Sequence, residues 1–165
     1  MEIKVLEKKD ADRYKKLRLE ALKLCPEAFA SSYEEEKEFT LETFENRLSN
    51  SHSYTLGAFE NGELLGVVTL QLEQKAKLKH RITIFAMYVA VEKRGKGLAK
   101  KLLKEAITKS KQMVGIEAIY LTVGAANQPA KNLYKSLGFA TYGIDKKALK
   151  IDNSYLDEEL MVLYF

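Results

Sequence analysis

The apolar and polar positions near the start of the chain first follow the two-residue period of a strand and then the period of about 3.6 residues of a helix. Apolar residues recur at helical spacing from Tyr14 to Leu24, which is typical of an amphipathic helix. Asp10 stands where it can cap that helix, and Pro26 follows its end. We therefore expect a strand over residues 2–6, a helix from Asp10 to about Cys25, a loop over residues 26–39 with the acidic run Glu34–Glu36, and a second helix capped by Thr40 and ending near Leu48.

Beyond residue 50 the hydrophobic period changes from helical to alternating. Tyr54–Phe59 and Glu63–Gln74 are rich in β-branched and aromatic residues, and the dipeptide Asn61-Gly62 between them tolerates the two positive φ angles of a type I′ turn. These two segments are predicted to form a β-hairpin. Arg81–Val91 is apolar at successive positions, which is typical of a central strand covered on both faces.

The second half of the chain alternates strands with helices. From Leu98 to about Val114, apolar side chains fill one half of a helical wheel and lysines the other. Asn127 can cap a further helix that stops at Gly138. This order implies a parallel strand pair in a sheet otherwise built from hairpins. With strands over Ala118–Val123, Phe139–Ile144 and Tyr155–Phe165, we expect a mixed α/β (α+β) fold in a single domain, residues 1–165.

The composition narrows the class of protein. A chain of 165 residues that is 46% hydrophobic and 30% charged suits one globular domain and excludes intrinsic disorder. The single cysteine, Cys25, excludes an internal disulfide and a cysteine-based zinc site, and it indicates a reducing compartment. The longest nearly uncharged apolar run, residues 82–91, is half of what a bilayer crossing requires. We expect a cytoplasmic protein with no membrane contact and no metal site.

The positive charge is concentrated in one segment. The net charge of the chain is +4, yet residues 92–111 alone carry +6, so the remainder is net negative. A compact positive patch suits a small ligand with several negative charges better than a nucleic acid, which contacts a stripe of basic residues across a fold. The alternative interpretation is a solvated lysine face on a helix.

A glycine-containing turn joins the predicted central strand to the lysine-rich helix. Gly95 and Gly97 let the backbone approach a ligand closely, and the first helical turn presents N–H groups that have no intrahelical partner. With Arg94, Lys96 and Lys100 beside it, the turn suits a pyrophosphate; alternatively, it only packs the helix on the sheet. It is not a dinucleotide fingerprint, which needs a third glycine where Lys100 stands, nor a P-loop, which needs Ser or Thr after its lysine.

A second motif lies in the helix predicted to start at Asn127. Together the two motifs resemble the acetyl-CoA-dependent N-acetyltransferases of the GNAT superfamily, with their pattern Arg/Gln-x-x-Gly-x-Gly/Ala and their later Asn and Leu-Tyr-x-x-x-Gly-Phe ending. The motif-level resemblance covers roughly residues 81–140, and the order of elements fits the family over the whole chain. The matching residues are Arg94, Gly97 and Ala99 in the first motif and Asn127, Tyr134, Gly138 and Phe139 in the second.

The resemblance implies a role for each motif. The strands over residues 81–91 and 118–123 should splay apart so that the pantetheine arm of acetyl-CoA lies between them and bonds their backbone. A backbone N–H near Val89, freed by a bulge, should stabilise the oxyanion of the tetrahedral intermediate. The expected catalytic residues are Tyr134 and Val89, and the expected acetyl-CoA-binding residues are Met87, Tyr88, Val89, Arg94, Gly95, Lys96, Gly97, Leu98, Ala99, Lys100, Asn127, Asn132 and Tyr134.

Tyr134 should face the thioester sulfur and mainly donate a hydrogen bond to the departing thiolate. With a pKa of about 10 for tyrosine and about 8.5 for a thiol, complete proton transfer is uphill by about 2 kcal/mol. The alternative for Tyr134 is a buried aromatic residue whose hydroxyl is satisfied elsewhere. Asn127 should contact the pantetheine amides, serve only as a helix cap, or do both.

The sequence does not identify a general base. An amine of pKa about 10 is protonated at pH 7, and forming the neutral nucleophile costs about 4 kcal/mol. Many relatives place a glutamate on the central strand for this purpose, and this strand has none. Glu73, His80 and Tyr88 are candidates by position, whereas the run Glu34–Glu36 is either a solvated patch or an attraction for a cationic acceptor.

Three functions follow from these features. The first is direct transfer of an acetyl group from acetyl-CoA to a primary amine in a ternary complex, since Cys25 lies outside the motifs and argues against a covalent thiol intermediate. The second is a non-catalytic acyl-CoA-binding or sensing module. The third, a nucleic-acid binder, lacks a basic stripe. The amine acceptor stays open among amino acids, polyamines, aminoglycosides, small peptides and protein N-termini, and a homodimer is common among relatives.

Overall fold

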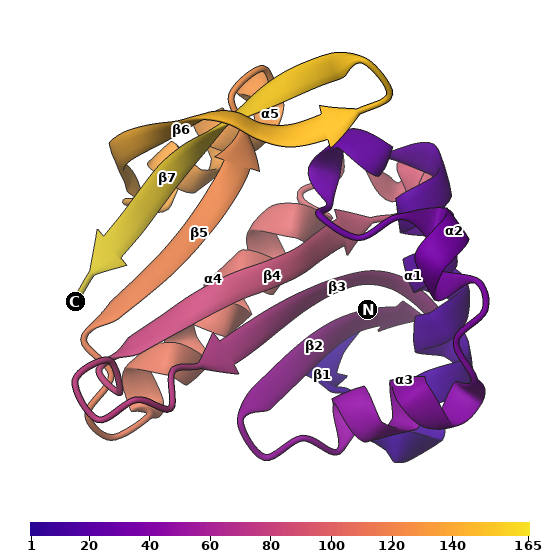
Figure 1. The fold of residues 1–165 in the computed structure, drawn as a ribbon. Coiled ribbons are helices and arrows are strands. Elements are labelled where there is room, and N and C mark those ends of the chain that lie inside the picture. Colours follow the sequence, from indigo (N-terminus) through magenta and orange to yellow (C-terminus); the bar gives the residue numbers. More distant parts are fainter.

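One seven-stranded sheet runs through the computed structural model, which describes residues 1–165 (Figure 1). Its strand order is β1-β2-β3-β4-β5-β7-β6, and every neighbouring pair is antiparallel except β4 and β5, which are parallel as predicted. The strands are β1 (Glu2–Val5), β2 (Ser53–Glu60), β3 (Glu63–Leu72), β4 (Arg81–Val89), β5 (Ala118–Gly124), β6 (Ala140–Ile151) and β7 (Ser154–Tyr164).

Helices cover both faces of the sheet. On one face, Val67 of β3 packs with Tyr14 and Phe44 from α1 and α3; on the other, its neighbour Val68 packs with Leu102 from α4. This two-sided cover explains why the central strands are apolar at successive positions. The helices are α1 (Ala11–Leu24), α2 (Tyr33–Glu36), α3 (Leu41–Leu48), α4 (Leu98–Gln112) and α5 (Gln128–Ser136).

The hairpin between β2 and β3 forms as predicted. Asn61 and Gly62 both have positive φ angles, 51° and 81°, and Glu60 pairs with Glu63 on either side of them. These are the φ signs of a type I′ turn, whose twist matches the twist of the flanking strands. The turn therefore sets the register that carries β3 alongside β4.

Three local predictions were wrong in detail. Asp10 precedes α1 but does not cap it, because its carboxylate accepts a hydrogen bond from the backbone N–H of Glu7 at 3.0 Å. The segment 26–39 is not all loop, since Glu34–Glu36 lies in the single turn of α2, which Ser32 caps. The last hairpin is longer than predicted. Its extension was not predicted because residues 145–151 are mostly exposed and polar and show no hydrophobic alternation.

None of the helices combines the length and apolar character that a bilayer crossing needs. Histidine, cysteine, aspartate and glutamate side chains nowhere gather in groups of three or more that could hold a metal ion.

Candidate active site

The parallel strands β4 and β5 separate soon after they begin. Their pairing is confined to Arg81–Thr83 on β4 and Ala118–Tyr120 on β5, and beyond these residues the two ribbons diverge (Figure 1). From there β4 continues beside β3 alone, while β5 continues beside β7. The splay expected from the sequence resemblance is therefore present, and it leaves one edge of β4 without a strand partner.

A β-bulge interrupts β4 at Ala86. Tyr88 pairs with Val67 and Phe85 pairs with Thr69, so two residues of β4 lie opposite the single residue Val68 of β3. Ala86 has a φ of 51°, a left-handed conformation that costs a residue with a Cβ about 1 kcal/mol. The bulge was expected near Val89 and lies three residues before it.

The main-chain groups of Val89 face the open edge of β4. The next residue, Ala90, donates its backbone N–H to Leu65 of β3 at 2.9 Å. Because successive residues of a strand point their N–H groups to opposite sides, the N–H of Val89 points away from β3. The carbonyl oxygen of Val89, on the same side, accepts a hydrogen bond from Nε of Arg94 at 2.9 Å.

The glycine turn before α4 presents a row of free backbone donors. Gly95 and Gly97 have φ angles of 73° and 77°, and a Cβ built on either would meet no atom within 4 Å, so the turn faces open space. No backbone N–H from Gly95 to Lys100 donates a hydrogen bond within the protein, and α4 has neither a side-chain cap nor an acidic residue in its first turn. Such a helix N-terminus suits a pyrophosphate.

Cationic side chains surround this turn. Arg94, Lys96 and Lys100 are exposed, and Lys96 contacts only the backbone oxygen of Glu92, at 3.4 Å. Lys93, by contrast, is held in an ion pair with Glu60 at 2.7 Å. The exposed cations and the free N–H groups together give this turn a positive surface whose chemistry suits a ligand with several negative charges.

Tyr134 lies on the buried face of α5. Its side chain is 7% exposed and its ring packs edge-on against Phe139, with the ring centres 5.8 Å apart. The hydroxyl has no hydrogen-bond partner in the protein, yet it is not among the fully buried unpaired groups. Burial raises the pKa of Tyr134 to about 12. The side chain therefore keeps its proton at neutral pH, and its hydroxyl has no partner within the protein.

The asparagines of the second motif have local partners. Asn127 caps α5, because its Oδ1 accepts a hydrogen bond from the N–H of Ala130 at 3.2 Å. Asn132 is exposed and accepts a hydrogen bond from Nε2 of Gln128 at 2.7 Å. In both residues the amide nitrogen donates no hydrogen bond within the protein, which leaves each with a donor for a ligand.

The structure disfavours all three general-base candidates drawn from the sequence. Glu73 accepts a hydrogen bond from Thr83, and His80 precedes β4, so both lie about 20 Å or more along β4 from Val89. Burial, and a hydrogen bond to Glu20 at 3.0 Å, raise the pKa of Tyr88, so its hydroxyl holds its proton.

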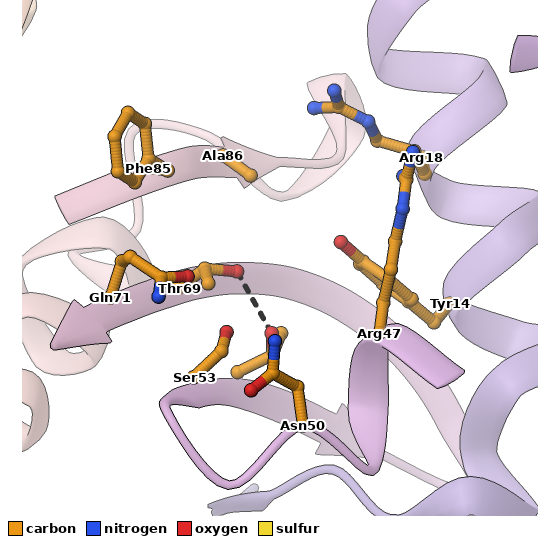
Figure 2. A pocket seen from close by; sticks show the side chains of 10 residues that line it. Tyr14, Arg18, Arg47, Asn50, Ser53, Thr69, Gln71, Phe85 and Ala86 are labelled. Carbon is orange, nitrogen blue, oxygen red and sulfur yellow. Dashed lines mark hydrogen bonds between the residues drawn. The ribbon is translucent and has the colours of Figure 1, made fainter. Parts of the chain in front are cut away.

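A pocket of about 300 Å³ lies on the sheet face covered by α1 and α3 (Figure 2). The bulge residue Ala86 lines it, together with side chains from β2 and β3. Two arginines, Arg18 from α1 and Arg47 from α3, form part of its lining. Both contact the buried Glu36. The complete lining is Tyr14, Arg18, Arg47, Asn50, Ser53, Thr55, Thr69, Gln71, Phe85 and Ala86.

Sequence reasoning missed these two arginines. The available signal was Arg18 itself, which lies on the apolar stripe of α1 between Leu17 and Ala21, where a charge needs a buried partner. Nothing in the sequence paired it with Glu36, because the two residues meet only when α2 folds back onto α1.

Comparison with known proteins places this geometry in a family. The sequence profile of the acetyltransferase (GNAT) family matches residues 18–139, and the chain belongs to this family. The L-amino acid N-acetyltransferase AaaT of Escherichia coli (strain K12) is 29% identical over 101 residues, which cover 61% of this chain and 62% of that protein. The spermidine N(1)-acetyltransferase of Vibrio cholerae is 32% identical over 84 residues, 51% of this chain and 49% of that protein.

The matched region thus spans between about half and two thirds of the length of these two relatives. Among solved structures, an acetyltransferase of the GNAT family from Streptococcus pneumoniae superposes with a TM-score of 0.88 at 26% identity, covering 99% of both chains. The fold class predicted from the sequence is therefore confirmed.

Proposed function

We propose that this protein transfers an acetyl group from acetyl-CoA to a primary amine. Three features support the proposal: family membership, the splayed strands β4 and β5, and the free backbone donors of the turn before α4. An amine acceptor agrees with the names of the two relatives, one an L-amino acid N-acetyltransferase and the other a spermidine N(1)-acetyltransferase. Residues 1–165 would act as one domain, because a single sheet connects all parts of the site.

Each part of the site has a task in this reaction. Acetyl-CoA supplies an activated thioester, whose acyl carbon–sulfur bond breaks as the carbon–nitrogen bond forms, the amine losing one proton and the thiolate taking one up. The N–H groups from Gly95 to Lys100 hold the pyrophosphate, with Arg94, Lys96 and Lys100 adding positive charge. Leu98 and Ala99 contribute through their backbone.

The open edge of β4 positions the reacting group. Met87 and Val89 offer backbone groups to the pantetheine arm, as an added strand would. Tyr88, expected from the sequence to do the same, pairs with Val67 and turns its main-chain groups toward β3. The outward N–H of Val89 stabilises the negative charge that develops on the thioester oxygen during attack. Asn127 and Asn132 offer their free amide nitrogens.

Tyr134 donates a hydrogen bond to the leaving sulfur. With a pKa of about 12 for Tyr134 and about 8.5 for a thiol, full proton transfer is uphill by about 5 kcal/mol. The tyrosine therefore stabilises the thiolate mainly without losing its proton, and the thiolate takes up its proton late in the reaction. β4 carries no carboxylate that could remove the proton of the amine, so the amine binds as its free base or loses its proton to water or to a group outside β4.

The row of free N–H donors at the start of α4 is the observation that carries this proposal. A thiol-release assay against a panel of amines, with acetyl-CoA and with longer acyl-CoAs, tests it. We expect acetyl-CoA-dependent thiol release that requires an amine.

A non-catalytic acyl-CoA sensor is the second candidate, favoured by the absence of a general base on β4. Saturable acetyl-CoA binding without thiol release for any amine in the panel would establish that candidate instead.

A further inference from the structure

The pocket beside the bulge of β4 contains a buried ion cluster. Glu36 is only 2% exposed and accepts two hydrogen bonds from Arg18, from Nε at 3.1 Å and from Nη2 at 3.0 Å. It accepts two more from Arg47, from Nη1 at 3.1 Å and from Nη2 at 3.4 Å. One carboxylate thus orients two guanidinium groups.

The same two guanidinium groups also stack over the faces of aromatic rings. Arg18 lies over the ring of Phe29 at 4.9 Å. Arg47 lies over two rings, Phe39 at 5.4 Å and Phe44 at 5.0 Å. Stacking and bidentate pairing leave little rotational freedom, so the remaining N–H groups of both arginines are oriented before any ligand arrives. These groups include Nη1 of Arg18 and Nε of Arg47, neither of which bonds Glu36.

The charge of the pocket is positive. Arg18 and Arg47 are the only charged side chains in its lining, and the other polar members are neutral amides and hydroxyls. Two guanidinium groups and the carboxylate of Glu36 sum to +1. Burial alone would raise the pKa of Glu36, but the hydrogen bonds and charges of the two arginines outweigh burial and lower it. The cluster therefore keeps this charge at neutral pH.

The size and place of the pocket suit a small acceptor. Its volume of about 300 Å³ is at the lower end of the range for ligand pockets. Ala86 and Phe85 of β4 form one wall, and Ala86 is three residues, or about 10 Å, from Val89. Figure 2 shows the side chain of Arg18 reaching from α1 toward this wall. The pocket therefore opens on the same strand as Val89, the residue proposed to hold the thioester.

We propose that this pocket binds an acceptor that carries a carboxylate as well as its amine, and that Arg18 and Arg47 bind that carboxylate. The inference rests on the proposed acetyl transfer and specifies its substrate class as small amino acids or amino-acid-like acids. A polyamine would bring only positive charges to a positive pocket that has no free carboxylate to receive them. The positive charge of the pocket also favours loss of the proton from the bound amine, because it disfavours the protonated, positively charged form of that amine.

Matched acceptor pairs test the proposal. Steady-state thiol release is measured with a panel of free α-amino acids, with the carboxamide of each, and with spermidine, and rates are compared per free amine. We expect kcat/KM to be about 10- to 100-fold higher for the best acid than for its carboxamide, the effect of hydrogen bonds to a charged group. The variant Arg47→Gln should reduce that ratio toward one by raising KM for the acid. The control Arg13→Gln, on the outer surface of α1, should preserve it.

The outcomes separate this inference from the function on which it rests. Equal rates for acids and carboxamides, or a preference for spermidine, would overturn the carboxylate site while acetyl transfer stands. If Arg47→Gln does not fold, the acid–carboxamide ratio of the unmodified protein still decides the question. Absence of acetyl-CoA binding in calorimetry would overturn acetyl transfer itself, and with it this inference.

Discussion

Arg94 ties the glycine turn to the end of β4, since its Nε donates to the carbonyl oxygen of Val89 at 2.9 Å. The same guanidinium contacts the sulfur of Cys25 at 3.4 Å and lies over the ring of Tyr88 at 5.3 Å. One side chain therefore connects the proposed pyrophosphate site with the backbone that is expected to hold the thioester. The positive charge of Arg94 favours the pyrophosphate, and its planar guanidinium group fixes the backbone at Val89.

The variant Arg94→Lys separates these two tasks, because lysine keeps the charge but cannot bond Val89 and Cys25 with one rigid group. We expect the acetyl-CoA Kd to change less than about 3-fold and kcat to fall about 10-fold, the worth of one hydrogen bond. Calorimetry and initial rates measure the two quantities. The matched variant Arg13→Lys should leave both unchanged. A large loss of affinity with an unchanged kcat would contradict a positioning role for Arg94.

The variant Gly97→Glu should weaken acetyl-CoA binding by at least about 10-fold. A side chain at a φ of 77° costs about 1 kcal/mol, and the added carboxylate repels the phosphates. Gly115 has a similar φ angle, 82°, and open space around it, but it lies in the turn between α4 and β5. Gly115→Glu therefore controls for backbone strain, and equal acetyl-CoA affinities in the two variants would count against the phosphate site.

The variant Tyr134→Phe should lower kcat by about 10- to 100-fold, the effect of losing a hydrogen bond to the charged leaving thiolate. The Kd for acetyl-CoA should change little, because phenylalanine keeps the ring that packs on Phe139. The exposed Tyr142 provides a control, and Tyr142→Phe should leave kcat unchanged. Because the pKa of Tyr134 is about 12, any alkaline loss of activity below pH 10 should persist in Tyr134→Phe. Full turnover by Tyr134→Phe would remove this residue from the mechanism.

Acid should destabilise the fold partly through Glu36. The pKa of Glu36 in the folded state lies below its ordinary value of 4.5, so its ion pairs contribute full stability above that pH. The contribution is lost as the pH falls through the lowered folded-state pKa. Tm is measured from pH 7 to pH 3 for the unmodified protein and for Glu36→Gln. Below pH 4.5 the Tm of the unmodified protein should fall more steeply than the Tm of the variant.

At pH 7, Glu36→Gln itself should lose about 3 kcal/mol, because it leaves two arginines without their buried carboxylate. The exposed neighbour Glu34, which pairs with Lys37 on the surface, is the control. Glu34→Gln should change stability by less than about 0.5 kcal/mol. Parallel Tm curves for the unmodified protein and Glu36→Gln would show that Glu36 does not govern acid stability.

Local sequence signals predicted most of the fold. The dipeptide Asn61-Gly62 determines its turn through φ angles that only a few residues adopt, and the lysine and leucine faces of α4 follow from helical geometry. The glycine turn was predictable for the same reason, because Gly95 and Gly97 mark positive φ angles directly.

The ion cluster and the position of the bulge could not be predicted from the sequence, because both depend on contacts between distant residues. Arg18 and Glu36 are 18 residues apart, and Glu36 and Arg47 are 11 apart, with no local pattern that joins them. The exact place of the bulge is also a property of two paired strands, since it depends on the register of β3 against β4. The pocket and its charge therefore emerged only with the three-dimensional structure.

The proposed acetyl transfer depends above all on the free N–H groups from Gly95 to Lys100 holding the pyrophosphate of acetyl-CoA. Backbone amide NMR of the ¹⁵N-labelled protein during a titration with coenzyme A tests this claim residue by residue. If these amides hold the pyrophosphate, we expect saturable shifts that are largest over them, because they gain charge-assisted hydrogen bonds. Saturable binding whose shifts fall elsewhere, or no binding at millimolar coenzyme A, would contradict it.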